Sequence, residues 1–269
     1  MKDLKVIHDD NGSFVDFSKK AKTYIQDSFQ IQFVSAEDSF YLGLYKPFFA
    51  IYPQIDTITS STSLLEVQYY NGSSFTAVTL IEEETDTLNR GGLITWEKPS
   101  DWTASSINGE ELYWIKLDIA DCDLTFAGLN VLFSSDADLK KEQYDIELHL
   151  PKNANSFAHY HEAARDEIVQ RMRNSGKATY SSQIFNDFAK WDFLDVSQIR
   201  QASKFLVLAK VMFDASTEID DKYYQKHRDY MDMFGEAFKL YFLSWDKDND
   251  GEVDTNERMG IRTSEFIKV

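Results

Sequence analysis

The chain has 269 residues, of which 43% are hydrophobic and 14% aromatic, so it can bury the core of one large or two ordinary globular domains. Its formal net charge of -17 argues against nucleic acid as a ligand, because phosphates are bound by clustered lysine and arginine. The acidic excess is uneven: residues 1–150 carry 11 basic and 25 acidic groups, whereas residues 151–245 carry 13 of each. We therefore expect two domains, 1–150 and 151–269, and no specific nucleic-acid binding.

Cysteine content and hydropathy suggest where the protein folds. Cys122 is the single cysteine, which excludes an intrachain disulfide and is usual for a protein assembled in a reducing cytosol. The sequence has no apolar run of signal-peptide length and none of about 18 residues. It therefore predicts neither secretion nor a membrane span.

The first half of the chain has the pattern of an all-β domain. Short runs rich in Val, Ile, Thr, Tyr and Phe alternate with turn residues, without a helix-length amphipathic stretch between them. Such spacing predicts an antiparallel β-sandwich over residues 1–150. The runs are QIQFVS, SFYLGLY, FFAIYPQI, SLLEVQYY, FTAVTLI, GLITWEK, LYWIKLDI, GLNVLF and YDIELHL.

One turn signal within this half is strong. Asn71 and Gly72 separate LEVQYY from FTAVTL, and Asn-Gly suits a type I′ turn because both of its central residues need positive φ. We expect the two flanking segments to be adjacent, paired strands.

Aromatic residues in the β half allow two interpretations. A sandwich core and its rim require large rings, and a platform that stacks on sugars requires them too. Packing is the simpler explanation, and spacing alone does not separate the two. The residues concerned are Tyr69, Phe75, Trp96, Trp102, Tyr113 and Trp114.

The pattern becomes helical after residue 151. A first helix is expected between an N-cap at Asn155 or Ser156 and a C-cap at Gly176. A second is expected over Ser197–Ala215, with Asp195 as its cap. A third, Ile219–Trp245, carries a broad aromatic stripe. Together they predict a small three-helix bundle, and the fold class is α+β.

Catalytic motifs are not evident. On a helix, His159 and His161 would point about 200° apart, so we do not expect them to share a metal ion with His149. No nucleophile elbow, phosphate-binding glycine loop or paired-cysteine motif is present. The run from Glu82 to Glu84 with Asp86 fits a solvated loop. We expect a protein that is not an enzyme, although a pair of glycosidase carboxylates remains an alternative.

The clearest ligand signal lies near the C-terminus, in the segment DKDNDGEVDTNE. It matches the twelve-residue EF-hand loop, with oxygen ligands at the required positions and Gly251 at the sharp turn. We therefore predict a single EF-hand-like loop that binds structural Ca²⁺ and fixes the C-terminus; the alternative is a solvated acidic turn. The expected metal ligands are Asp246, Asp248, Asp250, Glu252, Asp254 and Glu257.

The β half also resembles a sandwich module of tailed-bacteriophage structural proteins. The resemblance covers about 80 residues and depends on the order of a Y-x-G-x-x-x-P-F strand, an aromatic hairpin around Asn-Gly, a W-x-x-P-x-D-W segment and a Y-W-I-K strand. These features lie in Asp38–Phe48, Leu65–Val78, Gly92–Trp102 and Asn108–Ile119.

The helical half is similar to the head-to-tail connector (adaptor or neck) proteins of such phages. The similar segments are DEIVQRMRNSG, the stretch Phe188–Ala202 and the start of the third helix from Ile219. This resemblance implies a virion protein assembled in the host cytoplasm, forming a homo-oligomeric ring, commonly of twelve copies, that joins portal and tail or neck proteins. The large β half departs from the simplest connectors and would form an exposed platform, with fibre proteins among its partners.

Surplus amphipathic faces in the helical half agree with subunit contacts. The alternative is a calcium-assisted carbohydrate-binding module without enzymatic activity, in which the sandwich binds glycan.

Overall fold

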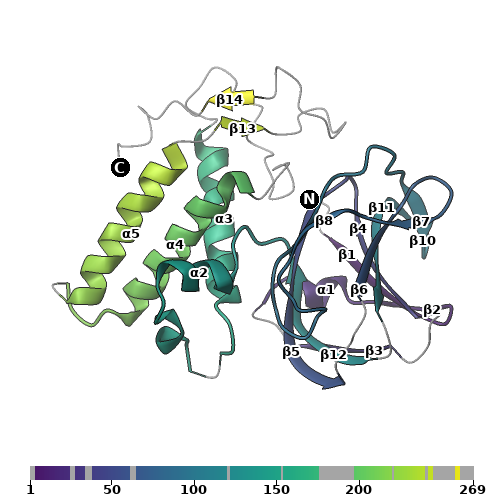
Figure 1. Ribbon diagram of the computed structural model, residues 1–269, viewed down its shortest axis with the longest axis horizontal. Coiled ribbons are helices and arrows are strands. Elements are labelled where there is room, and N and C mark those ends of the chain that lie inside the picture. The colour runs from purple at the N-terminus through teal and green to yellow at the C-terminus, as the bar shows by residue number, and fades with distance from the viewer. Residues whose placement is uncertain are drawn as a thin grey trace. The chain divides into compact units, whose positions relative to one another are not determined.

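The computed structural model combines two antiparallel sheets with a helical C-terminal part (Figure 1). It separates into two compact units, Met1–Val131 and Leu132–Val269, named here the β unit and the helical unit. This division lies earlier than the boundary expected near residue 150. The structure describes residues 4–24, 28–33, 38–60, 65–119, 122–152, 154–175, 197–219, 221–239, 242–244 and 258–260.

The first sheet of the β unit has seven described strands in the order β2-β1-β4-β11-β6-β7, and β10 also pairs with β11. All of these pairs are antiparallel, as the sequence predicts. The bounds are β1 Lys5–Asp10, β2 Ser13–Asp16, β4 Ser39–Leu44, β6 Leu65–Tyr70, β7 Phe75–Ala77, β10 Ser105–Ile107 and β11 Glu110–Ile119.

The second sheet has five described strands in the order β3-β12-β5-β9-β8, again antiparallel. A one-turn helix, α1 (Ser18–Ala21), follows β2. The strand bounds are β3 Phe29–Phe33, β5 Ala50–Ser60, β8 Leu80–Glu83, β9 Ile94–Trp96 and β12 Cys122–Asn130.

Side chains from the two sheets meet in one aromatic core. Phe40 of the first sheet lies edge-on to Phe33, with ring centroids 6.3 Å apart, and stacks on Phe126 at 5.6 Å. At one end, His8 of β1 meets the same Phe33 edge-on at 5.5 Å. Edge-to-face and offset stacking are the favoured geometries of aromatic rings, so the phenylalanines join the sheets through preferred contacts.

The aromatic residues of the β half for which sugar stacking was an alternative lie mainly in the core. Trp96, Trp102, Trp114 and Tyr69 are buried, which confirms packing as their role. Phe75 and Tyr113 are half-buried.

One expected strand was wrong. The run YDIELHL contains a single-turn 3-10 helix, Ile146–His149, instead. Its alternating pattern resembles a half-buried strand, but only Ile146 is buried, while Leu148 is 82% exposed. The backbone N–H groups of Ile146 and Leu148 donate to Gln143 and Asp145, so local turns satisfy the groups that a sheet would have paired.

Asn-Gly pairs form two kinds of turn. Between β1 and β2, Asn11 and Gly12 both have positive φ, 48° and 88°, and residues Asp10 and Ser13 pair directly, as a two-residue turn requires. Asn108 and Gly109 do the same between β10 and β11.

The predicted hairpin of β6 and β7 is confirmed, since Tyr70 pairs with Phe75, but its turn was predicted wrongly. Only Gly72 has positive φ in this loop. The Asn71 side-chain oxygen accepts hydrogen bonds from the Ser73 and Ser74 N–H groups. These bonds stabilise a four-residue loop instead of the type I′ turn.

The helical unit begins with α2 (Asp136–Glu142), which the sequence analysis missed, and continues with α3 (Ala158–Ser175) and α4 (Ser197–Ala215). The bounds of α4 match the prediction. The third expected helix was too long, because α5 ends at Lys239 and residues Phe242–Ser244 form a strand, β13, paired with β14 (Arg258–Gly260).

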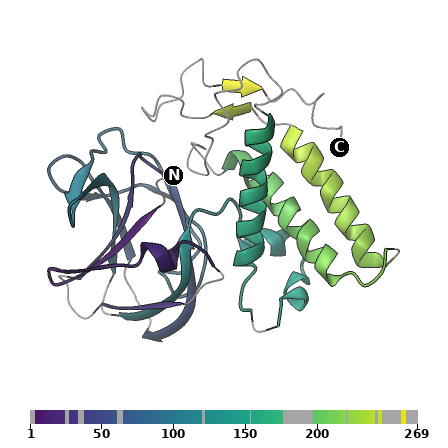
Figure 2. The ribbon, with the colours of Figure 1, turned by 180° about the vertical axis from the view of Figure 1, so that it is seen from behind.

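Helices α3, α4 and α5 lie side by side in Figures 1 and 2. Phe205 of α4 stacks on Tyr230 of α5 at 6.4 Å, and the Arg171 guanidinium of α3 lies 4.8 Å from the ring centre of Phe234. Tyr230, Phe234 and Phe238 of the expected aromatic stripe are buried. These three residues of the stripe therefore pack within the unit, Tyr223 is half-buried, and Tyr241 and Trp245 lie outside the described residues.

A close approach of backbone and indole ring in the β unit generates a stability prediction. A Cβ on Gly43 would lie 2.4 Å from Cζ3 of the fully buried Trp114. We expect Gly43→Ala to lower the free energy of unfolding by about 1–3 kcal/mol, as overpacked cores do, measured by urea denaturation. Gly235→Ala is the matched control, because no atom lies within 4 Å of its Cβ and alanine favours a helix. Equal stability of the two variants would contradict the close packing.

Candidate functional site

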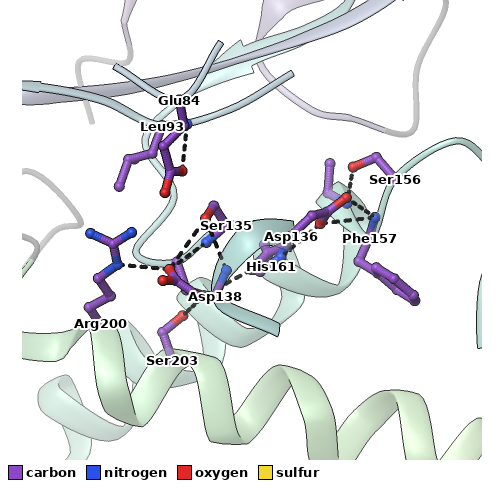
Figure 3. A network of polar contacts seen from close by, with 12 residues as sticks. Glu84, Leu93, Ser135, Asp136, Asp138, Ser156, Phe157, His161, Arg200 and Ser203 are labelled. Carbon is purple, nitrogen blue, oxygen red and sulfur yellow. Dashed lines mark hydrogen bonds and ion pairs between the residues drawn. The ribbon is translucent and has the colours of Figure 1, made fainter. Parts of the chain in front are cut away.

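A network of polar side chains at the start of α2 is the main candidate site of the helical unit (Figure 3). It draws residues from three separate helices and from the segment that precedes α2. Most of its members are buried although they are polar or charged, and buried polar groups need hydrogen-bond partners. Its members are Ser134, Ser135, Asp136, Asp138, His161, Arg200 and Ser203.

The N-terminus of α2 is closed by a capping box. The Ser135 hydroxyl accepts a hydrogen bond from the Asp138 N–H, and the Asp138 carboxylate accepts one from the Ser135 N–H at 3.0 Å. These bonds satisfy two donors that a helix end otherwise leaves unpaired. The negative charge of Asp138 also suits the positive end of the helix dipole.

Asp138 connects this cap to α4. The Nε of Arg200 donates to its carboxylate over 2.7 Å, and both side chains are largely buried. Burial raises the pKa of the Asp138 carboxyl, but the hydrogen bond and charge of Arg200 outweigh it, so the pKa lies below the usual value. The carboxylate is therefore held in its charged form.

Four further side chains form a continuous hydrogen-bonded chain. Ser203 Oγ lies 2.8 Å from Ser134 Oγ, which lies 2.8 Å from His161 Nδ1. The other ring nitrogen, Nε2, lies 3.1 Å from Oδ1 of Asp136. The chain thus joins α4, the segment before α2, α3 and α2 in that order.

The chemistry of the groups sets the direction of these bonds for a neutral imidazole. An ionised carboxylate can only accept, so His161 carries its proton on Nε2 and donates to Asp136. Nδ1 must then accept from the Ser134 hydroxyl, and Ser134 accepts in turn from Ser203. With this one arrangement of protons, each of the three hydrogen bonds has one donor and one acceptor.

A serine, a histidine and an aspartate that are hydrogen-bonded in series also make up the catalytic triad of many hydrolases. Here Ser134, Ser203 and the His161 ring have no exposed surface. The arrangement can polarise a hydroxyl, but in this state it presents no nucleophile to solvent. Its geometry is that of a connection between helices.

Asp136 has a second partner at the start of α3. Both of its carboxylate oxygens accept from the Phe157 N–H, at 3.3 and 3.2 Å. The Ser156 hydroxyl accepts from the Ala158 N–H at 2.9 Å, which agrees with the predicted capping role of Ser156. The first turn of α3 is therefore fixed both by its own serine and by α2.

The histidines named in the sequence analysis have separate surroundings. His149 packs against Tyr223 and His159 against Tyr160, with ring centroids 5.1 and 4.1 Å apart. His161 belongs to the network. Within the described ranges, no group of three or more His, Cys, Asp or Glu side chains is placed to hold a metal ion.

The expected calcium ligands, Asp246, Asp248, Asp250, Glu252, Asp254 and Glu257, lie outside the described residues, as does the expected cap Asp195. The described flanks of the loop are the paired strands β13 and β14, in which Ser244 pairs with Arg258. Neither flank is helical at these positions.

The acidic run in the β unit is more ordered than a solvated loop. Glu83 accepts hydrogen bonds from Thr85 and from the Thr87 N–H. Asp86, Thr87 and Leu88 all have positive φ, between 53° and 63°, a conformation that costs roughly 1–2 kcal/mol per residue. The Glu84 carboxylate accepts from the Leu93 N–H at 3.3 Å, as Figure 3 shows. The glutamates thus stabilise a left-handed turn.

Sequence reasoning missed the α2 network. The available signal was the capping pattern of Ser135 followed three residues later by Asp138, within a segment that had been interpreted as the end of the β half. Arg200 and Ser203 carry no local signal, because their partners lie more than sixty residues away.

Comparisons with known proteins find no family model, curated protein or solved structure that matches the chain significantly. Among the described helices, none combines the length and apolar character needed to cross a membrane.

Asp138 provides a prediction of pH-dependent stability. Its pKa is lowered on folding, so its contribution is present above the unfolded value and is lost as pH falls through the folded pKa. Asp138→Asn should therefore lower the free energy of unfolding by about 1.5–3 kcal/mol at pH 7, and the difference from wild type should shrink below about pH 4.

Denaturant titrations between pH 7 and pH 2.5 would measure this difference. Asp229→Asn is the control, because Asp229 is exposed on α5 and should change stability little. A difference between Asp138→Asn and wild type that does not vary with pH would show that the ion pair with Arg200 is not its source.

Proposed function

We propose that the chain is a structural component of a tailed-phage particle, a head-to-tail connector or neck ring subunit that joins portal and tail. The helical unit would supply the ring contacts, and the β unit would be an exposed platform or attachment site. The connector-like and sandwich-like sequence segments motivate this proposal, and the exposed surface of the helical unit supports it.

The observation that carries the proposal is a set of large apolar side chains that the helical unit leaves in solvent. Tyr144 is 94% exposed, and Leu148, in the following 3-10 turn, is 82% exposed. Phe213, in the last turn of α4, and Ile219, in the segment between α4 and α5, are also exposed. Such residues are expected where another subunit covers them.

The internal packing of the unit fits a part that must transmit force without deforming. Helix α4 is buried along most of its length against α3 and α5, and the Glu167 carboxylate receives bonds from Arg171 of its own helix and Lys210 of α4, both at 2.7 Å. Close packing and satisfied charges favour one conformation.

The alternative, a carbohydrate-binding module, is less well supported. Trp96, Trp102 and Trp114 are buried, whereas a ring that stacks on a sugar must be accessible. A glycan-binding role would have to use other residues.

Electron microscopy of the purified full-length protein tests the proposal. We expect closed rings, and docking of the protein onto the portal ring of the phage that encodes it. Tyr144→Ser with Leu148→Ser should weaken docking at least about thirtyfold, because truncating even one buried interface anchor costs about 2 kcal/mol or more. Glu147→Ser, a polar change in the same exposed turn, is the control. A single subunit without affinity for any particle component would contradict the proposal.

We also propose that the acidic segment from Asp246 to Glu257 binds Ca²⁺. The support is its ligand spacing, together with the pairing of β13 with β14 on either side, which brings the flanks of the segment together. The ion would fix the C-terminal part of the helical unit.

Asp246→Ala and Glu257→Ala should each weaken calcium binding strongly, because each removes carboxylate oxygens from the coordination shell. Calorimetric titration measures affinity, and limited proteolysis with and without calcium reports on the C-terminal segment. Asp56→Ala, at an exposed position of β5, should leave both unchanged. No heat and no change in proteolysis of the wild type would identify the segment as an acidic turn.

A further inference from the structure

A histidine occupies a core position of the β unit that an apolar side chain would fit. Val6 and His8 of β1 lie on the same face of the sheet, because side chains alternate along a strand, and they are 0% and 6% exposed. Their partners on β4 are Leu42 and Phe40, which are both fully buried. His8 therefore places a titratable ring in an otherwise apolar row. Such departures from the local pattern are expected at functional or strained positions.

One nitrogen of the His8 ring lacks a hydrogen bond. Phe33 of the second sheet meets the ring edge-to-face, with centroids 5.5 Å apart, and aromatic rings accept hydrogen bonds only weakly. The Nε2 atom is buried and has no hydrogen-bond partner among the residues that the structure describes. An unpartnered nitrogen is already unfavourable in the neutral ring, and burying a charged ring in the same place would be more so.

Three carboxylates act on the ring. Asp9 and Asp10 follow His8 in the chain, and the buried Asp38 lies immediately before β4. Burial lowers the pKa of the His8 imidazole, and the negative charges of Asp38, Asp10 and Asp9 offset this only in part, so the pKa lies below its usual value. The packing of the sandwich thus favours the neutral ring.

Other charged side chains of the neighbouring elements point elsewhere or lie in solvent. Asp16 of β2 lies on the opposite face of the sheet from His8, where it forms an ion pair with Lys5. Lys19 and Lys20 of α1 are exposed. Strands β3 and β4 contain no charged residue within their bounds. The ring therefore has an aromatic neighbour on the second sheet and carboxylates at one end of its own sheet.

From this placement we propose that His8 is a pH-sensitive switch of the β unit, which holds the hairpin of β1 and β2 against the second sheet while its ring is neutral and loosens the hairpin when the ring binds a proton. The neutral ring packs on Phe33, whereas the charged ring is better solvated by water. Because β1 and β2 form one end of the first sheet, they can loosen without breaking the pairs of β11 with its neighbours. The switch lies within the β unit and is independent of the proposed ring assembly.

Linkage sets the direction of the pH dependence. An unfolded histidine has the ordinary pKa of 6.5, and the folded pKa is lower, so the unfolded state binds more protons below pH 6.5. The contribution of the neutral ring is therefore complete above the unfolded pKa and is lost as pH falls through the folded pKa. This loss begins at a higher pH than the one expected from Asp138.

Hydrogen–deuterium exchange of the full-length chain, read by mass spectrometry, tests the switch. After correction for intrinsic rates, protection of the β1 and β2 amides should fall at least about threefold between about pH 7.5 and about pH 5, and protection of the β11 amides should fall less. His8→Leu and His8→Gln cannot bind the proton, so each should lose this pH dependence. His159→Gln is the matched control, because burial also lowers the pKa of His159 but that residue lies in α3.

A further variant separates titration from packing. Asp10 is exposed, and its charge raises the pKa of His8. Asp10→Asn should therefore move the midpoint of the exchange response to lower pH, and the His8 ring resonances, followed by nuclear magnetic resonance, should move with it. A purely structural role of His8 would leave the midpoint where it is.

Several results would overturn the switch. His8→Leu and His8→Gln that keep the wild-type pH response would show that another group titrates. Protection of β1 and β2 that does not change with pH in the wild type would show that the hairpin does not respond. If both His8 variants fail to fold, the wild-type resonances decide: a His8 ring that titrates at or above about pH 6.5 removes the inference.

Discussion

The helical unit depends on two aspartates in the first turn of α2, because each of them binds a different long helix. Asp136 accepts from the start of α3 and from His161, and Asp138 accepts from Arg200 of α4. Both carboxylates also lie at the positive end of the α2 dipole. The negative charges are therefore stabilised by hydrogen bonds from α3, by Arg200 of α4 and by the dipole of α2. In this way a seven-residue helix connects two helices of eighteen and nineteen residues.

The β unit is held together by a different kind of interaction. Its two sheets are joined by stacked and edge-on rings such as Phe33, Phe40 and Phe126, which gain stability from apolar burial without a directional charge. Its described charges lie mostly on the outside. Apolar burial thus sets most of its interior, although Asp38 and Lys46 are also buried there, whereas the helical unit uses the ion pair of Asp138 and Arg200 to join two of its helices.

The sequence predicted most strands and the long helices, because alternation and helical spacing report which face is buried. It failed where a competing local interaction was stronger. The Asn71 side chain bonds Ser73 and Ser74 and lengthens the expected turn, and Leu148 faces solvent in a segment with a strand-like pattern. The Ser134, His161 and Ser203 chain was beyond sequence reasoning, since only the packing of α3 and α4 brings these residues together.

The left-handed turn at Asp86, Thr87 and Leu88 sets a limit on how stable the β unit is. L-amino acids disfavour this conformation, yet buried Leu88 and the bonds to Glu83 hold it in place. Residues of opposite chirality, or glycine where no side-chain contact is lost, would adopt the same path without strain. The natural chain is therefore less stable than its own backbone trace would permit, as expected when selection requires sufficient and not maximal stability.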